Sequence, residues 1–326
     1  MRKNVKTCVT CTKDKVFSYF DTNHSIFEGL IISISQVIYE IDTQQGLAKL
    51  YHRTPDSTGF PVLFIHGFGS NSDIWFAFDD SLGNYFINNK MDCWALNLSN
   101  AISGNIQTLA HEDLLAAVDF IYKERNQRVL IVSHSMGGII TRVFTSSHLS
   151  HPYPLQQIER MVQGVALLTV PNHGVGSADI SRIEETVKLL HSFIKSDQEP
   201  LAADFGLGFI QLTPKSHLIT SLNEPLPLNS NIIWLNAVGS YDKVVPLNSA
   251  LFKESEVDQI PHFFQQEFPC DHMVYPFSKT IKKIVRVIPQ IIESSKLESR
   301  IRIYPAIHRY QPVGDWILKH LVKPLG

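Results

Sequence analysis

Apolar residues along the chain fall into two alternating patterns. Short, mostly apolar runs, typical of strands buried on both faces of a parallel sheet, occur at 62–65, 93–98, 129–132, 161–170 and 232–238. Stretches with apolar residues at helical spacing alternate with them, at 78–87, 108–125, 136–147 and 277–292. Repeated strand-then-helix order with short connections predicts an α/β fold with a doubly wound, mostly parallel sheet and right-handed crossovers.

Two further strands are predicted before this alternation begins. Residues 37–41 are rich in β-branched side chains, 42–46 contain turn residues, and 47–51 resume the strand pattern. Because no helix separates these two strands, we expect them to form an antiparallel edge of the sheet. The first 25 residues show neither periodicity, so we expect a flexible leader at 1–25.

One long interval, at 171–231, interrupts the alternation of strands and helices. It contains two apolar stretches followed by a proline-rich one. A structureless loop of that length is uncommon in a compact domain, so we expect an inserted helical cap at about 172–230. The predicted organisation is then the leader, one α/β domain at 26–295 that carries the cap, and a C-terminal extension at 296–326.

Composition and charge narrow the class of protein. With 44% hydrophobic and 18% charged residues, the chain has ordinary globular composition, which excludes a disordered or collagen-like protein. Its 29 basic and 31 acidic side chains leave a net charge of −2, so we do not expect nucleic acid as a partner. We see neither a membrane span nor the apolar segment of a cleaved signal peptide. A cytoplasmic protein is expected, with export by another route as the alternative.

The cysteines suggest no metal site. Cys8 and Cys11 form a lone C-x-x-C pair, while Cys93 and Cys270 stand alone. A zinc site would need two more ligands, and His24 is the only histidine near the pair. We interpret the pair as reduced thiols in the leader and expect no metal and no organic cofactor.

The strongest chemical signal is the sequence S-H-S-M-G-G, which directly follows a predicted buried strand. A strand that turns abruptly into a helix around G-x-S-x-G holds its serine exposed in a strained turn. Here that serine is Ser135, with the small residues Ser133 and Gly137 two positions before and after it. A helix beginning at Met136 would add positive potential where an oxyanion develops. Ser135 is therefore the candidate nucleophile, and the alternative is a serine in an ordinary strand-to-helix turn.

A second signal is H-G-F-G at 66–69, again directly after a predicted strand. Gly67 lets the backbone turn so that the next N–H, that of Phe68, points into the site. Phe68 and Met136 would then supply the two amide donors of an oxyanion hole. His66 is expected to brace the loop, and the alternative is a plain glycine-rich turn without chemistry.

A nucleophilic serine needs a base, and the base needs an orienting carboxylate. Asp242 follows the predicted strand 232–238 at its C-terminal end, where such an acid belongs. His272 comes immediately before the last predicted long helix and fits the general base. Asp271 is the rival acid, but because it adjoins His272 we expect it to project in a different direction.

The other histidines compete less well for the role of base. His134 adjoins the nucleophile and should point away from it, His262 is interpreted as a strand residue, and His217 lies in the cap. His173 stands in P-N-H-G at the mouth of the site. It is a candidate substrate-binding residue, with a loop histidine that satisfies backbone groups as the alternative.

These motifs occur in the order found in the α/β-hydrolase superfamily, to which the sequence is similar over about residues 60–293. The likeness is greatest to bacterial triacylglycerol lipases and lipase-like esterases, in which a T-x-P-x-x-G stretch, here T-V-P-N-H-G, follows the strand after the elbow. The resemblance implies the α/β-hydrolase fold and ester hydrolysis through an acyl-enzyme. The roles it implies are nucleophile for Ser135, base for His272, acid for Asp242, and oxyanion donors for the Phe68 and Met136 amides.

Two other functions stay open beside ester hydrolysis. An acyltransferase or thioesterase would use the same triad and differ only in the group that attacks or leaves the acyl-enzyme. A non-catalytic binding or regulatory module would keep the fold without the reaction.

The expected substrate is a small-molecule or lipid ester. Small-molecule sites are mostly apolar, so Phe205 and Phe209 in the cap are candidates to line an acyl tunnel, with a passive cap over a small-ester site as the alternative. The C-terminal stretch 315–323 combines an apolar side with basic residues. We expect a short helix docked on the domain or on a second protomer; the alternative is a peripheral membrane contact through this helix or the cap.

Overall fold

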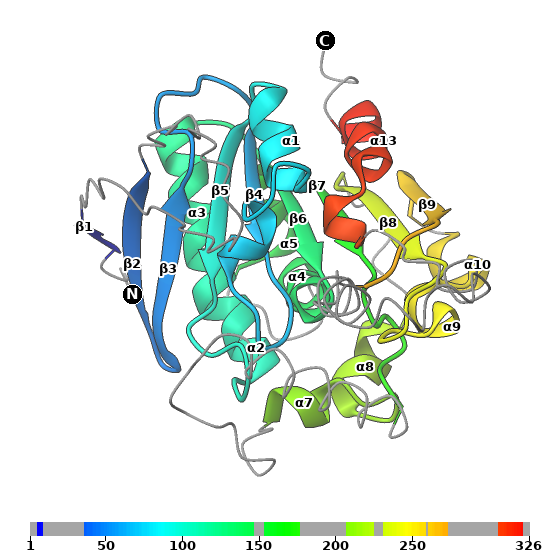
Figure 1. Ribbon diagram of the computed structural model, residues 1–326. Helices are drawn as coiled ribbons and strands as arrows, with labels where there is room; N and C mark the ends of the chain where they lie inside the picture. Colours follow the sequence, from blue (N-terminus) through cyan, green and yellow to red (C-terminus); the bar gives the residue numbers. More distant parts are fainter. Residues whose placement is uncertain are drawn as a thin grey trace, which may run out of the picture.

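The computed structural model describes residues 5–8, 36–146, 153–176, 207–224, 231–258, 260–272 and 306–321 of the 326. A nine-stranded sheet runs through these parts of the chain. Its strands are β1 (Val5–Cys8), β2 (Val37–Thr43), β3 (Gly46–His52), β4 (Pro61–Ile65), β5 (Asp92–Asn97), β6 (Val129–His134), β7 (Val162–Leu168), β8 (Ile233–Gly239) and β9 (Phe263–Phe268). Their order across the sheet is β1-β2-β3-β5-β4-β6-β7-β8-β9 (Figure 1).

The sheet is parallel except at one edge. From β5 to β9 every neighbouring pair of strands is parallel. β1, β2 and β3 pair antiparallel with one another and, through β3, with β5. The predicted mostly parallel sheet with antiparallel N-terminal strands is thus confirmed. One correction concerns the predicted flexible leader at 1–25, because four of its residues form β1, with Val5 opposite Ile41 and Cys8 opposite Ile38.

Strand β4 explains why the core strands are apolar at every position. All of its residues are buried. Leu63 and Ile65 belong to the core on one face of the sheet, whereas Val62 and Phe64 belong to the core on the other. Side chains alternate between the faces of a strand, so a strand covered by helices on both sides needs apolar residues throughout.

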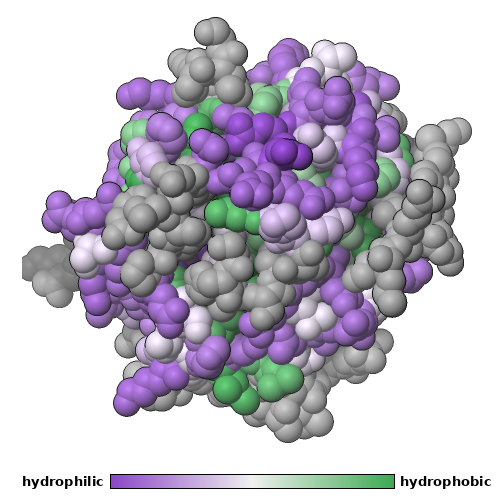
Figure 2. Space-filling view, turned by 180° about the vertical axis from the view of Figure 1, so that it is seen from behind, coloured by the Kyte–Doolittle hydropathy of each residue, from purple (hydrophilic) through white to green (hydrophobic). Residues whose placement is uncertain are grey.

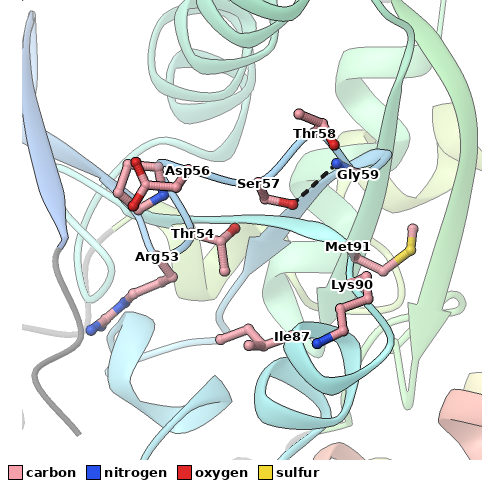
Figure 3. A pocket seen from close by; sticks show the side chains of 10 residues that line it. Arg53, Thr54, Asp56, Ser57, Thr58, Gly59, Ile87, Lys90 and Met91 are labelled. Carbon is pink, nitrogen blue, oxygen red and sulfur yellow. Dashed lines mark hydrogen bonds between the residues drawn. The ribbon is translucent and has the colours of Figure 1, made fainter.

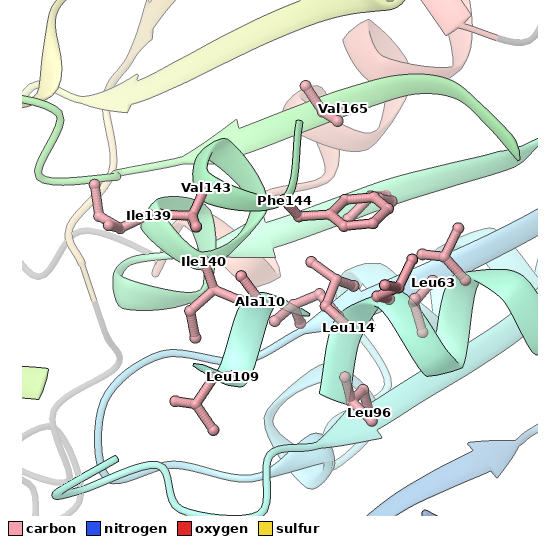
Figure 4. Close-up of a cluster of buried hydrophobic side chains, with 14 of the residues drawn as sticks. Leu63, Leu96, Leu109, Ala110, Leu114, Ile139, Ile140, Val143, Phe144 and Val165 are labelled. Carbon is pink, nitrogen blue, oxygen red and sulfur yellow. The ribbon is translucent and has the colours of Figure 1, made fainter. Parts of the chain in front are cut away.

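Helices cover both of these faces. On the side of Leu63 the described helices are α2 (Ile106–Thr108), η2 (Leu109–Leu114), α3 (Leu115–Arg125), α4 (Met136–Thr145) and α5 (Leu155–Met161). Figure 4 shows side chains of η2 and α4 meeting in this cluster, among them Leu114, Ile140 and Phe144. On the side of Phe64 lie η1 (Ser72–Trp75), α1 (Leu82–Asn88) and α13 (Gln311–Leu321).

The helix predicted at 108–125 begins irregularly, because its segment η2 is π-helical. The adjacent carboxylates Glu112 and Asp113 in η2 are both buried. Each accepts a hydrogen bond from a loop amide, Glu112 from Gln44 N and Asp113 from Ser99 N, both at 2.7 Å. The apolar spacing does not reveal this wider turn. The helix predicted at 277–292 lies outside the described residues.

The C-terminal helix α13 packs on the domain. Val313, Ile317 and Leu321 are fully buried, and the helix contacts α1, β7 and β8. A Cβ atom added at Gly314 would lie 2.7 Å from the ring of Tyr85 in α1, so glycine allows the two helices to approach closely. The apolar side of α13 is therefore covered by the domain itself.

No described helix has the length and apolar character that a membrane crossing requires. The face seen from behind in Figure 2 is mostly hydrophilic, with apolar residues in separate areas. Among the described large hydrophobic side chains, the most exposed are Leu207 (59%) and Ile210 (61%), both in α7 (Leu207–Gln211) of the cap.

The buried carboxylate of Asp92, at the amino end of β5, binds side chains from β3, β5 and α3. Asp92 is fully buried and is contacted by His52 Nε2 at 2.6 Å, Trp94 Nε1 at 2.8 Å and Arg125 Nε at 2.8 Å. Burial alone would raise the pKa of Asp92, but the hydrogen bonds from His52 and Trp94 outweigh it, so this pKa lies below its ordinary value. Asp92 thus joins β3, β5 and the end of α3.

Replacing Asp92 by alanine should destabilise the fold strongly. The change leaves the buried donors around it without a partner, and breaking a buried ion pair from one side typically costs about 3–5 kcal/mol. Urea unfolding measures this loss. The control is Asp73→Ala, because Asp73 is 65% exposed and its ion pair with Arg53 should contribute only about 0–1 kcal/mol. Equal losses for the two variants would contradict the structural role of Asp92.

Candidate active site

Ser135 lies in the turn between β6 and α4, in a backbone conformation that side chains other than glycine rarely adopt. Its φ is 54° and its ψ is −127°. Hydrogen bonds hold this turn, since Ser135 N donates to Leu168 O at 3.0 Å and Gly138 N donates to Ser135 O at 2.9 Å. A non-glycine residue persists in such a conformation only where the surrounding structure imposes it.

The residues around Ser135 must be small because the turn is tightly packed. A Cβ atom at Gly137 would lie 2.4 Å from the carbonyl oxygen of His66, and one at Gly138 would lie 2.0 Å from Val170. Ser133, in the position where the motif has glycine, is fully buried, and its Oγ donates to Ala166 O at 3.3 Å. A serine is accommodated there because its hydroxyl finds a partner.

The H-G-F-G loop runs directly against this turn. A Cβ atom at Gly67 would lie 2.9 Å from Cβ of Ser135, so only glycine allows the approach. His66 braces the loop, as expected, because its Nδ1 lies 2.9 Å from Gly67 O and its Nε2 accepts from Leu98 N at 3.2 Å. Burial lowers the pKa of His66 to about 4, so its imidazole is neutral at neutral pH.

Asp242 and His272 form a buried hydrogen-bonded pair. Asp242 Oδ2 lies 2.8 Å from Nδ1 of His272, and the two side chains are 1% and 4% exposed. The other oxygen, Oδ1, accepts from the amides of Val244 and Val245, each at 2.8 Å. Because the carboxylate accepts at Nδ1–H, the hydrogen bond fixes the tautomer of His272 and leaves Nε2 to take up a proton.

The rival acid Asp271 is engaged elsewhere. Its Oδ1 accepts from the backbone amides of His272 at 2.7 Å and Lys243 at 3.2 Å, and its Oδ2 lies 3.5 Å from Lys243 Nζ. Asp271 therefore holds the backbone on either side of the site, while Asp242 contacts the ring of His272.

The described residues show no hydrogen bond between Ser135 and His272. A hydrogen bond does connect the two chain segments that carry them. Nε2 of His134, the residue before Ser135, donates to the carbonyl oxygen of His272 at 3.1 Å. Catalytic hydrogen bonds are often long before substrate binds. The structure thus places the predicted nucleophile, base and acid at the carboxyl ends of β6 and β8 and after β9.

The sequence model of the alpha/beta hydrolase family matches residues 62–276, which include the whole of this constellation. The chain belongs to the alpha/beta hydrolase family. It is 26% identical over 229 residues to triacylglycerol lipase 1 of Arabidopsis thaliana, a match that covers 64% of this chain and 51% of the relative. The chain therefore spans about half the length of that relative.

Solved structures are also similar to this alpha/beta hydrolase, at low sequence identity. One is a highly thermostable carboxyl esterase from Bacillus coagulans in complex with glycerol, with a TM-score of 0.50, 15% identity, and coverage of 79% of this chain and 98% of that chain. Another is serine hydrolase CCSP0084 from Cycloclasticus zankles, with a TM-score of 0.49, 15% identity, and coverage of 80% and 99%. The α/β-hydrolase fold implied by the motifs is confirmed.

The described part of the predicted cap lies next to the H-G-F-G loop. Phe209 in α7 is buried, with its ring centroid 5.7 Å from that of Phe68. The helix is tied to the domain by Gln211, whose Oε1 accepts from Ile106 N at 2.8 Å. Phe209 is therefore close to a predicted oxyanion residue, while Phe205 lies outside the described residues.

His173 holds loops together. Its Nε2 lies 3.0 Å from Leu251 O and 3.3 Å from Glu256 Oε2, and its Nδ1 lies 3.2 Å from Asn223 Nδ2. Both ring nitrogens are thus engaged by α8 (His217–Leu222) and its C-cap, and by the segment from α9 (Leu247–Ala250) to α10 (Glu254–Val257). This placement does not support the prediction that His173 binds substrate, and favours the bracing alternative.

A hollow on the described surface of this alpha/beta hydrolase lies away from Ser135. Figure 3 shows a hollow lined by 53–59, Ile87, Lys90 and Met91. It lies at the amino ends of β4 and β5, whereas Ser135 follows the carboxyl end of β6. Among the described residues, no group of three or more His, Cys, Asp and Glu side chains is placed to hold a metal ion. Cys93 and Cys270 are free and buried.

His308 is a neighbour of the site that the sequence pattern did not single out. It lies in η4 (Ile307–Arg309), which the chain enters after Ala306 pairs with Asp271. Ile307 N donates to Asp271 O at 2.9 Å, so the segment returns beside the loop of the base. No motif marks His308, and it belongs to the predicted C-terminal extension.

Stability of this alpha/beta hydrolase should fall as the pH decreases from about 6.5 to about 4. Burial holds the pKa of His66 at about 4, that of His308 at about 3, and that of His134 well below its ordinary value. Each of these histidines takes up a proton only on unfolding in this range, which favours the unfolded state. Burial raises the pKa of Asp113 to about 6, which has the opposite effect.

Near pH 5, His66, His134, His308 and Asp113 together give uptake of about two protons on unfolding, or a loss of about 2.7 kcal/mol per pH unit. Burial also lowers the pKa of His111, which adds to this uptake. Urea unfolding at several pH values between 7 and about 4.5 measures the slope. Stability that stays constant or rises as the pH falls through this window would contradict the neutral, buried state of the three histidines.

Proposed function

We propose that this protein is a serine hydrolase that cleaves carboxylic esters through an acyl-enzyme formed on Ser135. The observation that carries the proposal is the strained Ser135 turn at the same edge of the sheet as the buried Asp242–His272 pair. A serine hydroxyl becomes a nucleophile when a base takes its proton and a third group orients that base. The family of the chain supports hydrolysis in general, and the name of its lipase relative supports an ester as substrate.

In the proposed reaction, Nε2 of His272 removes the proton of Ser135 Oγ as that oxygen attacks the ester carbonyl. Asp242 accepts the Nδ1–H hydrogen bond and stabilises the imidazolium that forms. The imidazolium then protonates the leaving alcohol, and the acyl group remains on Ser135. A water molecule, deprotonated by His272, attacks the acyl-enzyme. The carboxylic acid is released as the His272 imidazolium returns that proton to Ser135 Oγ.

The oxyanion is proposed to bind the amides of Phe68 and Met136. Met136 is the first residue of α4, and the first N–H groups of a helix have no acceptor within it. The helix N-terminus adds positive potential at the same point. Gly67 brings the segment of Phe68 against Ser135, which supports the Phe68 amide as a second donor to the same oxyanion.

The substrate proposed is a small-molecule or lipid ester with an apolar acyl group. The cap supports this choice, because Phe209 packs beside Phe68 at the proposed oxyanion hole. Apolar walls with few polar groups are usual in small-molecule sites. An acyltransferase would share every group named here and would show itself by transfer to added glycerol in place of water.

Ser135→Ala should abolish both ester hydrolysis and covalent labelling by a fluorophosphonate probe. The matched control is Ser133→Ala, two residues away, because Ser133 is buried and its hydroxyl only meets Ala166 O. This control should keep labelling and activity, since losing one such hydrogen bond costs about 1 kcal/mol of stability. Peptide mass spectrometry locates the probe, and stoichiometric labelling of Ser135→Ala at another serine would refute the assignment.

Asp242→Asn should lower kcat by about 10⁴ with the fold retained, because the amide cannot orient and stabilise the imidazolium as the carboxylate does. Asp271→Asn is the matched control. Its side-chain oxygen can still accept from the His272 amide, so a small change in kcat is expected. Steady-state kinetics with a nitrophenyl ester, beside urea unfolding of each variant, measure the difference. A large loss in Asp271→Asn with a mild one in Asp242→Asn would reverse the assignment of the acid.

A further inference from the structure

The ring of the proposed base, His272, packs in a buried group with two other histidine rings, those of His134 and His308. The ring of His134 is 4.5 Å from that of His272 and 5.6 Å from that of His308, between ring centroids. Trp75 closes the group, at 6.4 Å from His134 and 6.3 Å from His308. None of the four side chains is exposed. The proposed reaction uses only His272, so the other two rings need an explanation.

The backbone of His272 is held on both sides. Its amide donates to Asp271 Oδ1 at 2.7 Å, and its carbonyl oxygen accepts from Nε2 of His134 at 3.1 Å. Because a carbonyl can only accept, His134 carries its proton on Nε2. Its Nδ1 is buried without a hydrogen-bond partner among the described residues. The bond from His134 is therefore the only one its ring makes there, and it goes to the base.

His308 reaches this group from a distant part of the chain. The segment that carries it is joined to Asp271 by the hydrogen bond from Ile307. Its ring meets that of His134 edge to face, at an interplanar angle of 67°. Nδ1 of His308 is also buried without a hydrogen-bond partner among the described residues. The ring packs against those of His134 and Trp75. His308 lies beyond residues 62–276, which the family model matches.

We propose that His134 is a positioning residue for the base, holding the carbonyl of His272 through Nε2–H, and that His308 keeps the ring of His134 in place. This inference rests on the proposed role of His272. A base must be held within a fraction of an ångström of the proton that it takes, and a misplacement of 1 Å can lower a rate by about 10²-fold. Asp271 binds the backbone amide of His272, and the hydrogen bond from His134 holds its carbonyl group.

Electrostatics fit this role. Burial, and to a lesser extent electrostatic repulsion from the neighbouring imidazoles of His272 and His308, keeps the pKa of His134 well below its ordinary value, and burial lowers the pKa of His308 to about 3. Both rings are thus neutral at neutral pH. A charged ring behind the base would oppose the imidazolium that forms on His272, whereas two neutral rings do not.

The test compares two substitutions of His134 that differ in the hydrogen bond. His134→Gln offers an amide donor near the position of Nε2, whereas His134→Leu has similar bulk and no donor. We expect His134→Leu to lower kcat by about 10²-fold with KM unchanged, and His134→Gln to recover most of that loss. A purely structural role would make the two variants differ in stability alone. Should His134→Leu fail to fold, the more adaptable His134→Met takes its place.

A spectroscopic readout tests positioning without turnover. The Nδ1 proton that His272 shares with Asp242 should give a far-downfield proton NMR signal, identified by its loss in Asp242→Asn. We expect this signal to broaden or shift in His134→Leu and to be kept in His134→Gln. For the second ring, His308→Phe should keep both the signal and kcat because the packed ring remains, whereas His308→Ala should perturb both.

A folded His134→Leu variant with wild-type kcat and an unchanged signal would overturn the positioning role. His308→Ala behaving like His308→Phe would overturn the role of the second ring. Failure of the proposed function is distinguishable, because the wild-type protein would then show the downfield signal and its dependence on His134 but no hydrolysis of any ester.

Discussion

The positive φ of Ser135 is the constraint around which the rest of the site is arranged. A serine at φ 54° is not stable by itself, and the turn persists because strands and loops on every side leave it no room to relax. The last residue of β7, Leu168, accepts a hydrogen bond from the Ser135 amide. The end of β4 lies so close to Gly137 that a Cβ atom there would clash with it, and Val170 packs equally closely against Gly138. Parallel strands make this possible, because their carboxyl ends meet at one edge of the sheet.

The negative charge of the site, on the carboxylate of Asp242, lies at the same edge of the sheet. Asp242 is buried, but its carboxylate accepts two backbone amides and the ring of His272, so each oxygen has partners. Burial keeps the pKa values of His134 and His308 below their ordinary values, so neither ring places a positive charge near the pair at neutral pH. Burying neutral imidazoles lowers the stability of the fold at acidic pH, because unfolding lets these rings take up protons.

Much of this arrangement could be predicted from the sequence, where a local pattern has a single physical explanation. The apolar run of β4 and the small residues after β6 led to the buried strand and the strained turn, because few other structures suit them. The sequence favours Asp242 over Asp271 because Asp271 adjoins His272 and should project in a different direction, and the hydrogen bonds agree with that choice. Other features depend on contacts between distant segments. β1 exists through its pairing with β2, His173 is engaged by groups at 223, 251 and 256, and His308 meets His134 only once the chain has returned beside Asp271.

The central claim is that Ser135 carries the acyl group during ester hydrolysis. Rapid acid quenching during turnover of a nitrophenyl ester, followed by peptide mass spectrometry, tests it most directly. We expect an acyl group on the peptide that contains Ser135, appearing in step with a burst of nitrophenol that approaches one equivalent per chain. Ester hydrolysis without any acylated peptide, or with the acyl group on another residue, would contradict the account.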